Sequence, residues 1–397
     1  MSYSSPSSHK NYSGHPISST TALCSLIAAG TASFAFSSEV TSNPYQKQFD
    51  QVWAYSSLYK DEQNPILQEF KLRGRYQGQY HALDSDRGSD EGWEDRRSRI
   101  GFDAKLLEKH LELRTEFQSN DGFEDAYDRL VDAYIRWKPT SQLSITAGKI
   151  KPLIGYYDWI QSSTSQPTFE RSQIFNQLGV DRATSLTVEG KHGDVSWQTG
   201  IYSNDMDREF GTFGGSISFG AGIGYDARKS LGWDRADFHL DWLQSDHDAD
   251  DRVFRNYDTL VSATFWGAQG PWNLVIEGFT GLESTANSGD VFGIYIQPSY
   301  DLIPSTLQLV GRYAFAIGDG DASLSGQRRY ERSAPDLFPA GSAKGDQYHA
   351  FYLGAQYFIY GDKIKLMAGA EYSTLSGGAP ADDFEGVTFL TGIRMYF

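Results

Sequence analysis

The last eleven residues of the chain, 387–397, alternate between two kinds of side chain. Counting back from the terminal Phe397, every second residue is compatible with lipid, namely Met395, Ile393, Thr391, Phe389 and Val387. The residues between them are mostly smaller or more polar, namely Tyr396, Arg394, Gly392, Leu390 and Thr388. A period of two over this length indicates a β-strand with two different faces. Such a strand, ending on an aromatic residue, is typical of the closing strand of an outer-membrane barrel; the alternative is an edge strand of a soluble sandwich.

The same alternation recurs along most of the chain. In the first such segment Phe70 and Leu72 alternate with Lys71, Arg73 and Arg75, which predicts a strand with one apolar and one charged face. We predict sixteen strands, near residues 65–81, 96–107, 109–118, 129–138, 142–149, 182–191, 194–203, 213–225, 235–244, 257–266, 272–281, 291–300, 306–315, 346–359, 363–373 and 386–397.

Short and long connections alternate between these segments. The short ones include Pro139-Thr140-Ser141, His192-Gly193 and Gly361-Asp362. The long ones are predicted at 82–95, 119–128, 150–181, 204–212, 245–256, 282–290, 316–345 and 374–385. Short periplasmic turns on one rim and long extracellular loops on the other are characteristic of outer-membrane barrels. The sequence therefore predicts an all-β fold, a transmembrane antiparallel β-barrel of sixteen strands.

The composition agrees with a barrel and excludes a helical membrane protein. Aromatic residues make up 14% of the 397 residues, and there are 40 glycines against 13 prolines. Aromatic girdles at the membrane interfaces and glycines within strands would produce this bias. A mean hydropathy of −0.48 is too low for a bundle of apolar helices. A barrel tolerates this value because its lumen and loops are polar.

The first 64 residues do not alternate. Residues 22–36 are apolar and small but too short to span a bilayer, so we predict a signal peptide over 1–35, with the only cysteine, Cys24, inside it. Residues 36–64 are predicted to be an irregular or briefly helical leader, and 65–397 the barrel. The net charge is −16 and Lys10 is the only charged residue in 1–35, so the mature chain would carry −17. This charge argues against nucleic acid as a partner.

The long loop 150–181 is unusually aromatic for a solvent-exposed segment. We predict that it folds into the barrel and narrows the lumen. Its candidate constriction residues are Tyr156, Tyr157, Trp159, Phe169, Glu170 and Arg171.

Several short motifs resemble a known family, the phosphate-selective porins of the O and P type. They are Arg96-Arg97-Ser98-Arg99, Asp132-Ala133-Tyr134-Ile135-Arg136, Ala147-Gly148-Lys149-Ile150-Lys151-Pro152, Phe169-Glu170-Arg171-Ser172 and the terminal Phe397. The resemblance covers roughly residues 50–397. It implies a sixteen-stranded barrel in the bacterial outer membrane, a homotrimer, and lumen arginines that guide anions. It also implies that the last strand, with Phe397, is the signal read by the barrel-assembly machinery.

Eight arginines fall on the inward parity of the predicted strands, and we predict that they line the pore and bind anions. They are Arg73, Arg75, Arg97, Arg99, Arg114, Arg136, Arg312 and Arg394. A guanidinium is a permanent cation with several donors that can replace an anion's hydration. The alternative is that they pair with carboxylates on the same wall, such as Glu69, Asp103, Glu112, Glu116 and Asp132, and select nothing. The directions of Lys149 and Lys151 stay open.

The function expected from these features is a passive, water-filled channel for small hydrophilic solutes, with a preference for anions such as phosphate. The alternatives are a general-diffusion porin without selectivity and a β-rich surface binding protein. We expect no enzyme, because the one orienting trio, Asp237, His239 and Asp241, is the kind that a polar lumen face produces by chance. No metal or cofactor is expected. Outer-membrane lipid and small anionic or polar solutes are the other expected partners.

Overall fold

A computed structural model describes residues 45–119, 125–156, 160–178, 180–205, 208–246, 257–282, 289–320, 323–326, 343–378 and 383–397. The predicted signal peptide and the predicted constriction residues Tyr157 and Trp159 lie outside these residues. Within them, no helix is both long and apolar enough to cross a membrane.

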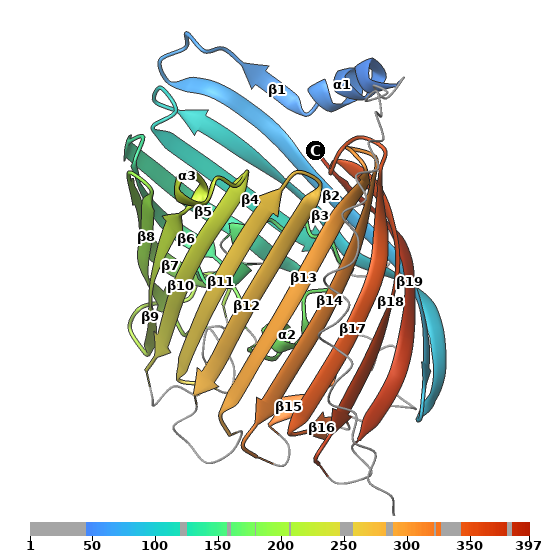
Figure 1. Cartoon of the computed structure of the whole chain (residues 1–397). Helices are drawn as coiled ribbons and strands as arrows, with labels where there is room; N and C mark the ends of the chain where they lie inside the picture. The colour runs from blue at the N-terminus through green and yellow to red at the C-terminus, as the bar shows by residue number, and fades with distance from the viewer. Residues whose placement is uncertain are drawn as a thin grey trace, which may run out of the picture. The chain divides into compact units, whose positions relative to one another are not determined.

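The described chain is built almost entirely from strands (Figure 1). The barrel strands are β2 (Leu67–Ser85), β3 (Gly88–Leu106), β4 (Leu111–Ser119), β5 (Arg129–Thr140), β6 (Leu143–Ile150), β7 (Ala183–His192), β8 (Val195–Ser203), β9 (Ile217–Asp226), β10 (Arg235–Ser245), β11 (Thr259–Gln269), β12 (Trp272–Leu282), β13 (Val291–Ile303), β14 (Leu307–Gly318), β17 (Gln347–Phe358), β18 (Ile364–Ser376) and β19 (Phe384–Tyr396). The remaining elements are α1 (Gln46–Ala54), β1 (Ser57–Lys60), α2 (Gln173–Leu178), α3 (Arg228–Leu231), β15 (Leu324–Ser325) and β16 (Lys344–Gly345).

The barrel strands form a closed antiparallel barrel of sixteen strands, as the sequence predicted. Each pairs with its neighbours along the chain, and closure comes from β19 pairing with β2, with Leu390 opposite His81. Phe397 extends this seam, because its N–H and C=O both bond to Gly74, at 3.0 and 3.2 Å. Closure removes the sheet edges that would otherwise expose unpaired backbone groups.

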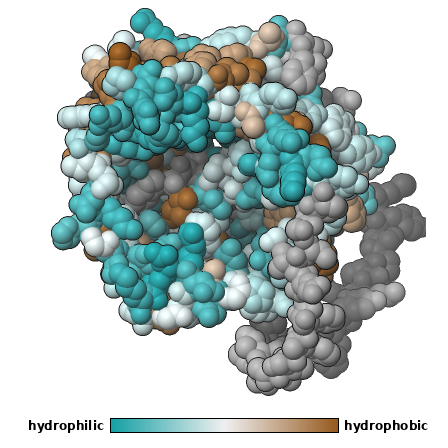
Figure 2. Space-filling model, turned by 90° about the horizontal axis from the view of Figure 1, so that it is seen from above, coloured by the Kyte–Doolittle hydropathy of each residue, from teal (hydrophilic) through white to brown (hydrophobic). Residues whose placement is uncertain are grey.

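Side chains alternate between an outer wall and a lumen along the regular parts of the barrel strands. On β3, for example, Ile100 and Phe102 are 45% and 44% exposed on the outside, whereas Arg97 is 6% exposed on the inside. Seen from the end with the short turns, hydrophilic residues surround a hollow in the middle of that face (Figure 2).

The leader crosses the short-turn end of the seam. Strand β1 pairs with residues 69–71 of β2, just beyond the point where β19 ends. The Trp53 indole donates a 2.7 Å hydrogen bond to the Tyr396 carbonyl, and Phe49 stacks on Tyr360 with ring centroids 5.1 Å apart. Tyr360 also donates a hydrogen bond to Asp50, which raises the pKa of Tyr360 to about 12.

The predicted long loop at 82–95 is wrong. Strands β2 and β3 continue through it and meet in a tight hairpin, with Gly88 at a φ of 123°. Polar residues occupy both faces of this hairpin: His81 and Asp90 contact each other on the inside at 3.0 Å, and Tyr80 bonds Glu91 on the outside at 2.6 Å. A strand that is polar on both faces has no hydrophobic alternation, so the pattern could not reveal it.

Candidate functional site

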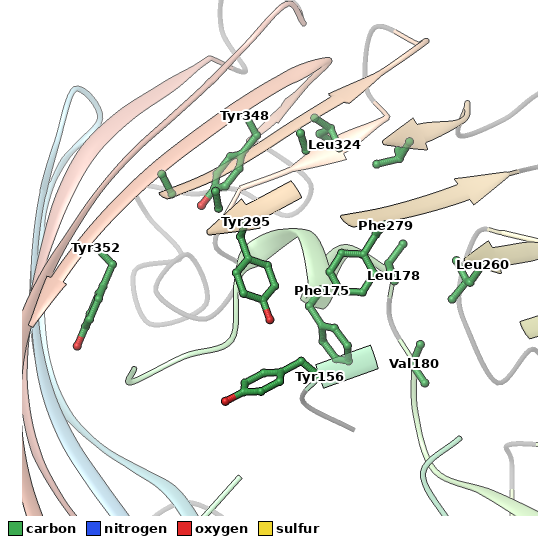
Figure 3. Close-up of a cluster of buried hydrophobic side chains, with 14 of the residues drawn as sticks. Tyr156, Phe175, Leu178, Val180, Leu260, Phe279, Tyr295, Leu324, Tyr348 and Tyr352 are labelled. Carbon is green, nitrogen blue, oxygen red and sulfur yellow. The ribbon is translucent and has the colours of Figure 1, made fainter. Parts of the chain in front are cut away.

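The loop that follows β6 enters the barrel and packs against the inner wall. Tyr156 and, on α2, Phe175 are each 2% exposed. Phe175 meets Phe279 of β12 edge-on, with ring centroids 5.6 Å apart, and Tyr156 meets Trp266 of β11 at 5.2 Å. Figure 3 shows the Phe175 ring beside the Phe279 ring. An apolar cluster therefore holds the loop against the wall formed by β10–β13.

Two buried carboxylates on the same wall bind the loop backbone. Asp241 accepts a 2.9 Å hydrogen bond from the Gly155 N–H, and Glu277 accepts a 2.8 Å bond from the Tyr156 N–H. Tyr295 donates to the other oxygen of Glu277 at 2.6 Å. Gly155 has a φ of +68°, and a Cβ there would lie 2.4 Å from Glu277 Oε1, so only glycine fits this turn.

Arginines on β3, β14 and β19 also bind the loop. Arg96 holds both oxygens of Glu170, at 2.7 and 3.0 Å. Arg312 donates to the Glu170 carbonyl at 2.8 Å and to Glu371 at 2.7 Å. Arg394 donates to Gln79 at 2.5 Å and to the Phe169 carbonyl at 3.4 Å. Arg312 and Arg394, both 4% exposed, therefore position the loop.

A second group of arginines converges on two carboxylates of the lumen wall. Glu116 lies 3.3 Å from Arg99, 3.6 Å from Arg73 and 3.9 Å from Arg75. Asp103 lies 2.9 Å from Arg73 and 2.8 Å from Arg114. Several guanidinium groups thus share one anion, and in the structure that anion is the protein's own carboxylate.

The last two predicted pore-lining arginines are separate from both groups. Arg97 donates to Gln77 at 2.5 Å, and Arg136 lies 3.8 Å from Glu189. All eight predicted arginines thus occupy the inner wall, but they are divided among several partners and do not form one ladder. Of the predicted carboxylate partners, Glu69 and Glu112 bind Lys105 and Lys138, and Asp132 binds Arg182.

Between the loop and the wall formed by β3–β6 lies a cavity of about 480 Å³, which we call the basic pocket. Its lining contains nine cationic side chains, namely Arg96, Arg97, Arg99, Arg129, Lys149, Lys151, Arg171, Arg182 and Arg208, and two carboxylates, Asp181 and Glu209. Glu116, Asp132 and Glu170 bind members of this set. When these three carboxylates are added to the two in the lining, nine cationic side chains still face only five carboxylates.

Several residues of the basic pocket were not predicted from the sequence. The clearest is Lys149, which falls on the outward parity of β6 but lines the pocket, with Nζ 2.5 Å from Glu209. Gly148, at a φ of +133°, breaks the alternation just before it. Burial acts to raise the pKa of Glu209, but hydrogen bonds from Lys149, Tyr127 and the Leu130 N–H hold it below its usual range. Four more residues lie at strand ends or in loops, where strand parity does not predict which way a side chain points. They are Arg129, Lys151, Arg182 and Arg208.

A second, smaller cavity of about 150 Å³ borders the same loop, and we call it the amide pocket. It is lined by Tyr156, Gln161, Ser165, Pro167, Asn273, Val275, Gln297, Ser299, Gln308, Gln356, Phe358 and Asp362. Five of these side chains are amides, one is a carboxylate and none is a cation. The two cavities differ in charge although one loop borders both.

Comparison with known families confirms the resemblance seen in the sequence. The model of a family described as phosphate-selective porin O and P matches residues 70–230. This range contains strands β3–β9 and the loop that enters the barrel. A search of curated proteins gave no match.

The barrel also resembles solved porin structures, at low sequence identity. OmpF of Salmonella typhi, solved with daunomycin, superposes with a TM-score of 0.58 at 15% identity, covering 86% of this chain and 100% of OmpF. An anion-selective porin of Comamonas acidovorans gives 0.57 at 12%, covering 83% and 99%. OmpT of Vibrio cholerae gives 0.56 at 14%, covering 86% and 99%. The family match and the shared fold support a porin channel in the bacterial outer membrane.

Proposed function

We propose that this porin is a passive, water-filled channel that prefers anions such as phosphate over cations. The observation that carries the proposal is the basic pocket, with nine cationic side chains against two carboxylates in its lining. Seven of the nine are arginines. Guanidinium groups bind the oxygens of phosphate or carboxylate through paired hydrogen bonds, which suits them to oxyanions.

The pairing of arginines with wall carboxylates does not cancel this charge. Glu116 neutralises one of the three arginines around it, and Glu170 neutralises Arg96. Lys151 and Arg171 contact the Phe175 ring at 5.8 and 5.1 Å, and both line the pocket. A surplus of cations therefore faces the cavity.

The acidic net charge of the chain has little effect on ions inside the lumen. Exposed carboxylates sit in water, and their field fades over a Debye length of about 8 Å at physiological salt. A cation inside a narrow lumen is screened less, because the surrounding protein has a lower dielectric constant. We therefore expect the local lining to outweigh the net charge of −16.

Block of chloride current by phosphate in planar bilayers tests the proposal. If phosphate binds in the basic pocket, adding it should reduce chloride current through the wild-type channel. The double variant Lys151→Gln with Arg171→Gln removes two pocket cations, and we expect it to weaken this block at least several-fold.

The matched control is Lys105→Gln with Lys138→Gln. These lysines also face the lumen, but they bind Glu69 and Glu112 and do not line the basic pocket. Equal weakening in both double variants would assign the effect to overall lumen charge. Absence of phosphate block in the wild type would leave a general-diffusion porin.

A further inference from the structure

The wall of the amide pocket is built on neighbouring strands at the short-turn end of the lumen. Asn273 and Ser299 are cross-strand partners on β12 and β13, and Gln308 and Gln356 are cross-strand partners on β14 and β17. Asn273 and Gln308 each lie two residues beyond a short turn. The amide side chains therefore form one continuous surface on four adjacent strands.

A chain of hydrogen bonds sets the direction of two of these amides. A carboxylate can only accept, so Asp301 takes a 2.7 Å hydrogen bond from Gln308 Nε2. The Gln308 oxygen in turn accepts a 2.8 Å bond from Gln356 Nε2. This order leaves Gln356 Oε1 without a donor among the described residues, although Gln356 is only 2% exposed. A buried acceptor of this kind in a cavity wall indicates a place for an occupant that carries donors.

Trp266 of β11 orients two other residues of the pocket. Its indole N–H donates a 2.7 Å hydrogen bond to Asn273 Oδ1, so the group that Asn273 can offer to a solute is its amide N–H. Its ring meets the Tyr156 ring edge-on, with centroids 5.2 Å apart, and the Arg235 guanidinium lies 3.6 Å from its ring centroid. These contacts position Asn273 and Tyr156 before any solute arrives.

The charge of the pocket does not suit an ion. Among the described residues that line it, none is a cation and one, Asp362, is a carboxylate. Lys365, which is fully buried, lies 3.1 Å from Asp362 and donates to the Gln166 carbonyl at 3.0 Å. An anion would meet no opposite charge here, and a cation would compete with Lys365 for Asp362. Amides both donate and accept hydrogen bonds, as hydroxyl groups do.

Apolar surface lies beside the amides in the same cavity. Tyr156, Pro167, Val275 and Phe358 contribute it. The C–H groups of a sugar ring or a cyclic polyol can pack on such surface while the hydroxyl groups bind the amides. A volume of about 150 Å³ leaves room for one such ring.

We propose that the amide pocket binds a neutral, hydroxyl-rich solute of the size of a single sugar ring. Asn273 donates to a hydroxyl oxygen of this solute, and Gln356 accepts from a hydroxyl group. The amide pocket shares no lining residue with the basic pocket, so the inference goes beyond anion preference and does not rest on it.

Block of chloride current by myo-inositol in planar bilayers tests the proposal. Inositol is neutral and carries a hydroxyl group on every ring carbon. It should reduce the wild-type current in a saturable manner. Triethylene glycol, which is neutral and of similar size but poor in hydroxyl groups, should reduce the current only in proportion to its concentration. No saturable block by inositol, or equal saturable block by both solutes, would overturn the proposal.

Two matched variants assign the block to this pocket. Gln356→Met keeps the length of the side chain but removes the amide, and it should raise the half-blocking concentration of inositol at least several-fold. The control is Gln198→Met on β8, because Gln198 is also 2% exposed but does not line the amide pocket. It should keep the wild-type block. An equal loss of block in both variants would overturn the assignment.

A third variant changes the donor side of the pocket with little change of shape. Asn273→Asp keeps an oxygen for the Trp266 indole but replaces the amide N–H groups with an acceptor. Heat-modifiable migration on a gel verifies that the barrel folds. We expect inositol block to weaken at least several-fold in the folded variant. Wild-type block in both Gln356→Met and Asn273→Asp would overturn the proposal.

Discussion

The basic pocket and the amide pocket border the same loop but have opposite character. The basic pocket has nine cations around about 480 Å³, whereas the amide pocket has five amides, one carboxylate and about 150 Å³. Toward the amide pocket the loop is held by apolar packing and by Glu277. Toward the basic pocket, Arg96 of β3 binds the loop residue Glu170. The loop therefore fills the lumen beside one wall and leaves a cavity lined by cationic side chains beside the other.

Detaching the loop should have the largest effect on this difference. Phe175→Ala removes a ring that is 2% exposed and contacts Phe279, which should cost about 3–5 kcal/mol of loop packing. We expect a larger single-channel conductance and weaker discrimination between ions, because the loop no longer restricts the lumen. Phe292→Ala, on an outward ring that is 48% exposed, is the control and should leave conductance unchanged. Unchanged conductance in Phe175→Ala would show that the loop does not restrict passage.

Arginine substitutions at the adjacent residues Gln308 and Leu309 compare how the amide pocket and the outer wall tolerate a charge. Leu309 is 40% exposed toward lipid, whereas Gln308 lines the amide pocket. Leu309→Arg should cost about 2–4 kcal/mol of folding free energy near the membrane midplane, measured by urea unfolding in vesicles. Gln308→Arg should fold normally and increase anion preference, because it gives the amide pocket a cation. Phe102→Arg and Ile135→Arg should behave like Leu309→Arg, and Gln118→Arg like Gln308→Arg. Similar stability of both sets would contradict the assignment of faces.

The leader offers the smallest expected effect, because it touches neither pocket. Trp53→Phe keeps an aromatic ring beside Tyr360 but removes the bond to the Tyr396 carbonyl. The loss of one hydrogen bond should lower stability by about 0.5–1.5 kcal/mol. Conductance and selectivity should stay at wild-type values. A change in selectivity would mean that the leader reaches the conduction path.

Strand number and facing were predictable from the sequence because a period of two is a direct consequence of strand geometry. Phe102 and Ile135 on the outside and Arg73 and Arg394 on the inside follow from parity alone. The hairpin at 82–95 was missed because Tyr80 and Glu91 are polar partners on its outer face.

The basic pocket could be predicted only in part. Arg97 and Arg99 lie within a regular strand, so parity placed them inside. Lys149 follows Gly148 at a φ of +133°, and Arg208 lies in a loop, so their directions depend on backbone turns that no periodicity describes. Glu116 lies close to Arg73, Arg75 and Arg99 because of the strand register. Closure of the barrel determines this register.

The reversal potential in planar bilayers under a salt gradient tests the central claim most directly. Three arginines lie beside Glu116, and the double variant Arg73→Gln with Arg99→Gln removes the positive charge of two of them. The negative charge of Glu116 is then neutralised less completely. We predict an anion-selective wild type and a shift of the reversal potential toward cations in this double variant. A cation-selective wild type, or the same reversal potential in both proteins, would contradict the claim that the lumen arginines select anions.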